Sequence, residues 1–127
     1  MASGEAFRRL LQERVELHLT DCGRRSGQEH SRPVWFVVEG NSLHLLPVGG
    51  SDTNWYRNIL VHPDVTLTVD GESLQVRARP VIQPALVAAT VERFRARYGA
   101  NQVARYYTKL DVAVEIELPP GSHTTPA

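Results

Sequence analysis

Alternating hydrophobic and polar residues indicate a β-hairpin in the middle of the chain. Residues 65–69 and residues 74–78 each carry an aliphatic side chain at every second position, and Asp70 and Gly71 separate the two runs. A period of two puts the aliphatic side chains on one face of a sheet, and Asp-Gly is typical of two-residue hairpin turns. The pattern therefore predicts two antiparallel strands joined at Asp70 and Gly71.

The same reasoning predicts four more strands. They are expected at residues 15–20, 33–39, 42–48 and 111–118. Residues 33–39 are apolar on both alternating faces, which favours a central strand covered on both sides. Gly40 and Asn41 tolerate a positive φ and predict a second hairpin turn. The polar segment 22–32 is expected to be an exposed loop or the tip of a long hairpin.

Apolar spacing, together with residues that start and stop helices, predicts three helices. They are expected at residues 4–13, 55–61 and 84–98. The last is the best marked, because Pro84 fits a first helical turn and Gly99 suits the position after the last turn. Residues 101–107 form a short stretch whose helical or irregular conformation the pattern leaves open.

Six strands in a chain of 127 residues leave many sheet edges to protect. Closing the sheet on itself removes exposed edges. We therefore expect a mainly β protein with helices (α+β), built on a six-stranded, mostly antiparallel barrel with the helices against its mouth and side. Residues 1–118 are expected to form one domain, and residues 119–127, which show no periodicity, a disordered tail.

Composition narrows the function classes. Fourteen Lys and Arg residues balance fourteen Asp and Glu residues, so the formal net charge is zero. This balance argues against duplex nucleic acid or an anionic membrane surface as the main partner. The first 19 residues include several charged side chains, so neither a signal peptide nor a membrane span is expected. The single cysteine, Cys22, excludes a disulfide within the chain and suits a reducing cytoplasm.

Patterns for metal binding or nucleophilic catalysis are not recognisable. The five histidines are scattered, without the i, i+4 pair of a helical metal site, so we assign no metal. Cys22 could act as a nucleophile only beside a base placed by the fold. The remaining candidates are segments that can bind a ligand.

The first candidate ligand site is the sequence Gly-Arg-Arg-Ser-Gly at residues 23–27, which places Arg24, Arg25 and Ser26 between glycines. Guanidinium groups match phosphate or carboxylate oxygens, and glycines let the backbone approach an anion, so this loop can bind an anionic group. A solvated hairpin tip is the alternative, because charged loops with glycine are common.

The second candidate runs from Gly49 to Asn58 and leads into a predicted helix. The N–H groups of the first helical turn, together with the helix dipole, favour an anion or the edge of a flavin. Arg57 can serve a ligand or a neighbouring carboxylate, and Asn58 can cap the helix or cross-link loops. Trp55 can equally pack into the core.

Tyrosines near the end of the chain form the third candidate. Tyr106 and Tyr107 follow the long predicted helix, and adjacent residues point in different directions, so at least one of them can reach the mouth of the barrel. A tyrosine there can donate a hydrogen bond to a substrate oxygen. Phe94 and Tyr98 already have an explanation as part of the apolar face of the helix.

Four motifs in a fixed order add a resemblance to this interpretation. They are Leu-Thr-x-x-Gly-Arg-Arg-Ser-Gly at 19–27, Arg-Pro-Val-Trp-Phe-Val-Val-Glu-Gly at 32–40, Leu-Leu-Pro-Val-x-Gly-Ser-Asp-Thr-x-Trp-Tyr-Arg-Asn at 45–58 and His-Pro-Asp-Val at 62–65. Together they resemble the deazaflavin-dependent nitroreductase and quinone reductase family across nearly all of residues 15–118. The resemblance implies the split β-barrel of flavin-binding oxidoreductases and the cofactor F420, a deazaflavin with a phosphate and a polyglutamate tail.

The resemblance also implies where this cofactor binds. The loop at residues 23–27 matches the family's loop for the anionic tail, and the helix start at residues 55–58 matches the segment beside the cofactor. Gly49 stands where members often carry a basic residue, so FMN is the alternative cofactor. The cofactor-binding candidates are Arg24, Arg25, Ser26, Gly27, Gly50, Ser51, Trp55, Tyr56, Arg57 and Asn58.

The implied activity is the transfer of a hydride from reduced F420 to a small acceptor such as a quinone, a nitroaromatic compound or an activated alkene. Tyr106 or Tyr107 is expected to contact the acceptor. Such a reaction needs two flat rings in register and no protein nucleophile. The alternatives are an FMN-dependent oxidoreductase with the same barrel, and a non-catalytic barrel that carries a lipid or another small ligand. A monomer and a homodimer both fit the strand pattern.

Overall fold

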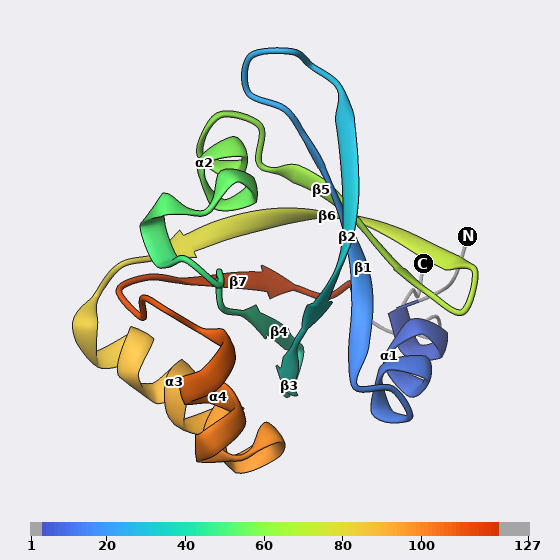
Figure 1. Cartoon of the computed structure of the whole chain (residues 1–127). Helices are drawn as coiled ribbons and strands as arrows, with labels where there is room; N and C mark the ends of the chain where they lie inside the picture. The colour runs from blue at the N-terminus through green and yellow to red at the C-terminus, as the bar shows by residue number, and fades with distance from the viewer. Residues whose placement is uncertain (1–3, 120–127) are drawn as a thin grey trace.

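A curled antiparallel sheet of seven strands forms the centre of the computed structural model, which describes residues 4–119 (Figure 1). The strands are β1 (Glu16–Cys22), β2 (Glu29–Trp35), β3 (Val37–Glu39), β4 (Ser42–Leu45), β5 (Asp64–Val69), β6 (Glu72–Val81) and β7 (Ala113–Glu117). The helices are α1 (Gly4–Gln12), α2 (Asn54–Val61), α3 (Pro84–Tyr98) and α4 (Ala100–Tyr106), with a 3₁₀ turn, η1 (Gly50–Asp52), before α2. The predicted α+β class and antiparallel sheet are confirmed, whereas the predicted number of six strands is wrong.

The additional strand comes from residues 33–39, which the sequence predicts as one central strand. β2 ends at Trp35 and β3 begins at Val37, and these two strands lie at opposite ends of the order β2-β1-β5-β6-β7-β4-β3. At the break, the side chain of Phe36 is fully buried, and its backbone N–H donates to the Tyr98 hydroxyl at 3.1 Å instead of to a neighbouring strand. Because the chain passes directly from β2 into β3, the two ends of the sheet are held together and the sheet stays curled.

The predicted central hairpin is present and longer than expected. β5 and β6 pair from Asp64 to Arg77, and the turn residues Asp70 and Gly71 have positive φ angles of 52° and 80°. β6 continues to Val81, and its second half pairs with β7. A single long strand therefore joins the two halves of the sheet.

The predicted helices are confirmed with small shifts at their ends, and α4 shows that most of residues 101–107 is helical. α3 ends at Tyr98, and Gly99 follows with a φ of 96°, which favours glycine. No helix in the described range is long and apolar enough to cross a bilayer. Residues 120–127 of the predicted tail lie outside the described residues.

Two groups of buried hydrophobic side chains hold the helices against the sheet. The larger joins α1 and α2 to strands from both halves of the sheet and includes Leu19, Trp55 and Ile116. The smaller lies around α3 and α4 and includes Val87 and Phe94 from the predicted apolar face of α3. Packing of α2 and α4 matters for function, because both helices contribute residues to the candidate site.

Candidate functional site

The Gly-Arg-Arg-Ser-Gly loop forms the tip of the long β1–β2 hairpin, which extends away from the sheet (Figure 1). Within the tip, the Gly23 N–H donates to the Gln28 carbonyl at 2.8 Å, and the Gly27 N–H donates to the Gly23 carbonyl at 3.0 Å. These backbone groups are therefore used by the loop itself. An anion at this tip would be recognised mainly by the arginine side chains.

A basic cavity of about 340 Å³ lies between this hairpin and α2. It is lined by Gly23, Arg24, Arg25, Ser26, His30, Arg32, Asn54 and Asn58. Four of the predicted site residues, from two segments about 30 positions apart in the sequence, thus surround one space. We call it the basic cavity.

A hydrogen-bonded network behind the basic cavity fixes the orientation of Asn58, which is only 5% exposed. Its Oδ1 accepts from the backbone N–H of Arg24 at 3.1 Å and from Arg24 Nη1 at 2.8 Å. Its Nδ2 donates to Oδ2 of the buried Asp21 at 2.7 Å, and the other carboxylate oxygen of Asp21 is paired with Arg32. Asn58 therefore cross-links the hairpin to α2, one of the roles expected from the sequence.

The basic cavity carries a net positive charge. Arg24, Arg25 and Arg32 contribute three guanidinium groups to its lining, whereas the network includes a single carboxylate, that of Asp21. Arg24 and Arg32 are held by the network, but Arg25 is exposed and has no ion-pair or hydrogen-bond partner among residues 4–119. Arg25 is therefore the guanidinium most available to an incoming anion.

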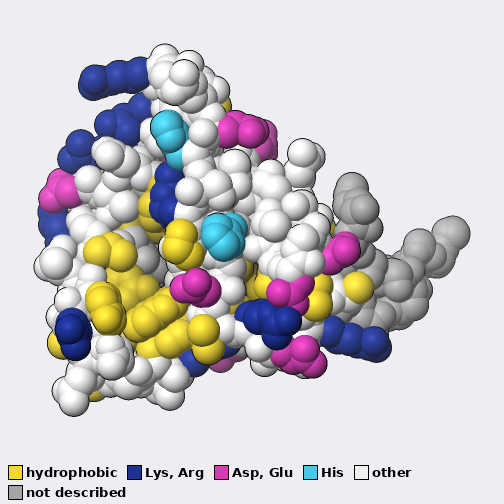
Figure 2. Space-filling model, turned by 45° about the vertical axis from the view of Figure 1, so that its right-hand side comes forward, with side chains coloured by type: hydrophobic (Ala, Val, Ile, Leu, Met, Phe, Trp, Pro, Cys, Tyr) yellow, Lys and Arg dark blue, Asp and Glu magenta, His cyan; other side chains and the backbone are white. Residues whose placement is uncertain are grey.

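An aromatic cavity of about 380 Å³ also has Arg32 in its lining. Its lining residues are Glu16, Arg32, Pro33, Val34, Trp35, Leu46, Val48, Trp55, Tyr106 and Tyr107. Because Arg32 lines both cavities, the basic and the aromatic cavities are neighbours. Figure 2 shows one face of the molecule, where several Lys and Arg side chains lie at the upper left and a continuous hydrophobic area lies below them.

Aromatic contacts hold the walls of the aromatic cavity in place. The ring of Trp35 stacks on Tyr98 with 4.3 Å between centroids, and Tyr106 meets Trp35 edge-on at 5.5 Å. Tyr107 is buried, and burial raises the pKa of its hydroxyl above the usual value, so this hydroxyl stays protonated at neutral pH. Tyr106 is 48% exposed at the opening. The two adjacent tyrosines thus line the same cavity with different exposure.

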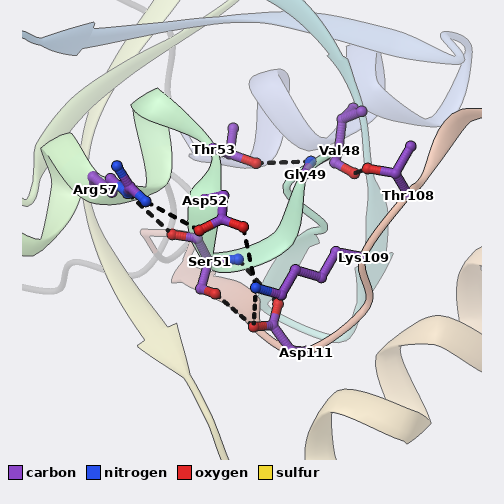
Figure 3. Close-up of polar contacts among 9 residues, drawn as sticks. All are labelled: Val48, Gly49, Ser51, Asp52, Thr53, Arg57, Thr108, Lys109 and Asp111. Atoms are coloured by element: carbon purple, nitrogen blue, oxygen red, sulfur yellow. Dashed lines mark hydrogen bonds and ion pairs between the residues drawn. The ribbon is translucent and has the colours of Figure 1, made fainter.

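The loop around Gly50 is tied to the segment before β7 (Figure 3). Ser51 donates to Asp111 through its backbone N–H at 2.9 Å and through its hydroxyl at 2.5 Å. Lys109 Nζ lies 3.1 Å from a carboxylate oxygen of Asp52, and this hydrogen bond lowers the pKa of Asp52. We call these contacts the loop clamp, because they hold the start of α2 against the chain that follows α4.

Five of the predicted cofactor-binding residues line neither cavity. They are Gly27, Gly50, Ser51, Tyr56 and Arg57. Arg57 pairs instead with Asp52 at 3.0 Å, which is the neighbouring-carboxylate alternative noted from the sequence. Ser51 is engaged with Asp111, and Tyr56 is buried in the core.

Sequence reasoning missed several residues that line the two cavities or support them. They are Asp21, His30, Arg32, Trp35 and Asn54. Asp21 stands at a position where strand alternation places a side chain in the core, and a charge there signals a buried ion pair. That signal was present in the sequence. Its partner was not identifiable, because Arg32 lies on the other arm of the hairpin.

The family of this chain follows from a direct comparison. Residues 2–119 match the model of the F420H(2)-dependent quinone reductase family. The chain belongs to this family. The resemblance stated from the four sequence motifs is thereby confirmed. The protein is an oxidoreductase, and its cofactor is F420.

Solved structures support the fold assignment. A structure described as an F420-H2 dependent reductase (FDR-A) has a TM-score of 0.63 and 19% identity, covering 82% of this chain and 95% of that chain. A structure described as an F420 reductase has a TM-score of 0.61 and 22% identity, covering 91% of this chain and 94% of that chain. HutZ, a heme storage protein from Vibrio cholerae, has a TM-score of 0.69 and 17% identity, covering 96% of this chain and 93% of that chain. At these identities, the likeness shows a shared fold.

The residues present fit an F420 molecule. This cofactor combines a flat deazaflavin ring with a phosphate and glutamate carboxylates, and the chain pairs an aromatic cavity with a basic one. Trp35 and Trp55 are among the aromatic residues that line the aromatic cavity, and the guanidinium of Arg25 has no competing partner among the described residues. Within residues 4–119, no grouping of three or more His, Cys, Asp or Glu residues could hold a metal ion.

Proposed function

We propose that this protein reduces a small acceptor, such as a quinone, a nitroaromatic compound or an activated alkene, with a hydride supplied by bound F420H2. The observation that carries the proposal is the adjacency of the two cavities, which meet at Arg32. A ligand with a flat ring and a charged tail needs such a pair of neighbouring spaces. A carrier of an uncharged lipid has no need of the three arginines.

In this proposal, the basic cavity binds the anionic tail. Arg25 binds phosphate or carboxylate oxygens directly, and Arg24 is oriented by Asn58. The Ser26 hydroxyl accepts from the Gln28 N–H at 3.1 Å, which orients it and leaves its own proton to donate to the anion. Binding the tail in a separate cavity fixes the position of the ring through contacts away from the reacting atoms.

The aromatic cavity holds the ring and the acceptor against each other. Trp35 and Trp55 form the apolar walls and exclude water, while Tyr106 and Tyr107 contact the acceptor. The hydroxyl of Tyr107, which stays protonated, donates a hydrogen bond to an acceptor oxygen. The cavity volume of about 380 Å³ falls within the usual range of small-molecule sites, roughly 300–1,000 Å³.

Titration of the purified protein with F420 and with FMN tests the proposal. Fluorescence should report saturable binding of F420 and much weaker binding of FMN. Addition of menadione to the protein with F420H2 should then restore the fluorescence of oxidised F420. Binding of F420 without reduction of any quinone, nitroaromatic compound or alkene would contradict the proposed activity, and a lipid retained through purification would support the carrier alternative.

Tyr106 gives a prediction on the acceptor side. Removing its ring in Tyr106→Ala should raise KM for menadione about two- to thirteenfold, because an aromatic contact contributes about 0.5–1.5 kcal/mol. The dissociation constant of F420 should change little. Tyr106→Phe keeps the ring and serves as the matched control, so an equal effect in both variants would assign the role to the hydroxyl. Steady-state kinetics with unchanged KM in Tyr106→Ala would exclude Tyr106 from the acceptor site.

Two further expectations stay predictions. A structure described as a domain-swapped dimer has a TM-score of 0.64 and 19% identity to this chain, which supports testing for a homodimer by light scattering. The cytoplasmic location also remains a prediction, based on the single cysteine.

A further inference from the structure

Asp21 is a buried charge that the proposed cofactor contacts leave unexplained. Only 1% of this residue is exposed, and both carboxylate oxygens are used: one pairs with Arg32, the other accepts from Asn58 Nδ2 at 2.7 Å. Taking a carboxylate out of water is costly unless it is paired and hydrogen-bonded. The pair therefore has a fixed geometry, because moving Arg32 away would leave a buried charge without its partner.

The fixed partner, Arg32, stands at the junction of the two cavities. It lines the basic cavity together with Arg25 and the aromatic cavity together with Trp35. Among residues 4–119, its hydrogen bonding involves only Nη1, which faces Asp21. A guanidinium has five N–H donors, so several remain for a ligand.

We propose that Arg32 binds the phosphate of the cofactor, between the ring and the glutamates, and that Asp21 is the positioning residue that holds Arg32 there. The proposal rests on the cofactor placement described under the proposed function. A ligand that occupies both cavities has to pass Arg32, because this residue belongs to both linings. Arg32 thus contacts the part of the ligand between ring and tail.

Asp21 acts on a second guanidinium through Asn58. Because Asp21 accepts from Nδ2, Oδ1 of Asn58 is turned toward Arg24 and accepts from its Nη1 at 2.8 Å. One buried carboxylate therefore orients two of the three arginines in the basic cavity. Arg25 lies outside this network.

Net charge and positioning make opposite predictions for Asp21→Asn. The substitution removes one negative charge beside the basic cavity, so a purely electrostatic effect would tighten anion binding. Loss of positioning would weaken it, because Arg32 and Asn58 lose the group that orients them. We expect positioning to dominate and the dissociation constant of F420 to rise about tenfold or more.

Two probes separate positioning from general damage to the site. F420 carries ring and tail, whereas the corresponding deazariboflavin carries the ring without phosphate or glutamates. Asp21→Asn should weaken binding of F420 in a fluorescence titration and leave binding of the deazariboflavin within about twofold of wild type. The matched control is Asp64→Asn, which removes a carboxylate from the exposed pair that Asp64 forms with Arg77 at 4.0 Å. It should leave both dissociation constants unchanged.

Other outcomes overturn the inference. Unchanged or tighter binding of F420 to Asp21→Asn would leave only the electrostatic effect. An equal loss for both probes would show that Asp21 merely supports the fold.

A second variant serves if Asp21→Asn does not fold. Arg32→Lys should then weaken binding of F420 but not of the ring without its tail, and the control Arg77→Lys should change neither. Unchanged binding of F420 to Arg32→Lys would show that Arg32 is not a ligand contact. If the wild-type protein binds no F420, both the inference and the proposed function fail. If it binds F420 equally well with and without Asp21, only the inference fails.

Discussion

Arg25→Ala should weaken F420 binding by about 1–3 kcal/mol, which is roughly a five- to 150-fold rise in the dissociation constant. Arg25 lies on the exposed hairpin tip and lines the basic cavity, and it has no protein partner among the described residues. Its charge is therefore available to the ligand, and its loss removes no hydrogen bond or ion pair within the described part of the chain. The free energy of unfolding should stay within about 0.5 kcal/mol of wild type.

Fluorescence titration at low and high salt measures this effect. The loss caused by Arg25→Ala should shrink as salt rises, because an exposed charge is screened. Arg77→Ala removes another exposed arginine, which lines neither cavity, and serves as the control. An unchanged dissociation constant in Arg25→Ala at low salt would remove Arg25 from the cofactor site.

Gly50→Ala should destabilise the protein by roughly 2–5 kcal/mol. Gly50 has a φ of 58°, and a Cβ atom there would lie 2.2 Å from Asp111 Oδ1 and 2.9 Å from the backbone carbonyl oxygen of Lys109. The side chain of Asp111 and the backbone at Lys109 would both have to move. These two residues form the loop clamp at the start of α2, so the positions of Trp55 and Asn58 should change as well.

Gly40→Ala separates backbone strain from steric contact. Gly40 has a similar φ of 61°, but a Cβ atom there would meet no atom within 4 Å. Urea unfolding should therefore show a smaller loss for Gly40→Ala, about 1 kcal/mol, than for Gly50→Ala. Equal losses in the two variants would contradict a close packing role for Gly50. F420 affinity should fall only in Gly50→Ala.

Much of the local structure could be predicted from residue patterns. The helix at 84–98 and the hairpin around Asp70 and Gly71 depend on periodicity and on start or stop residues that are neighbours in the chain. The same reasoning gave a wrong prediction for residues 33–39. Apolar residues on both faces predicted one buried strand, but the strand divides at Phe36. The N–H of Phe36 donates there to the hydroxyl of Tyr98, which lies 62 positions away in the sequence.

The candidate site shows the same limit at the level of single residues. The arginine loop and Asn58 were identified from motifs, and the structure brings them to one cavity. Ser51 and Arg57 belonged to an equally suggestive motif, but they line neither cavity: Ser51 donates to Asp111, and Arg57 pairs with Asp52. A motif specifies which groups a segment offers. It does not show whether the protein itself already uses them.

The order and type of residues along the chain determined the elements of this protein, its family and the presence of an arginine-rich loop suited to anions. Only the tertiary structure decided that this loop faces α2 across a basic cavity and that an aromatic cavity adjoins it at Arg32. It also decided that the buried Asp21 contacts both Arg32 and Asn58. The physical reason is that periodicity and turn chemistry act between neighbours in sequence, whereas burial and charge pairing depend on which distant segments meet when the sheet curls.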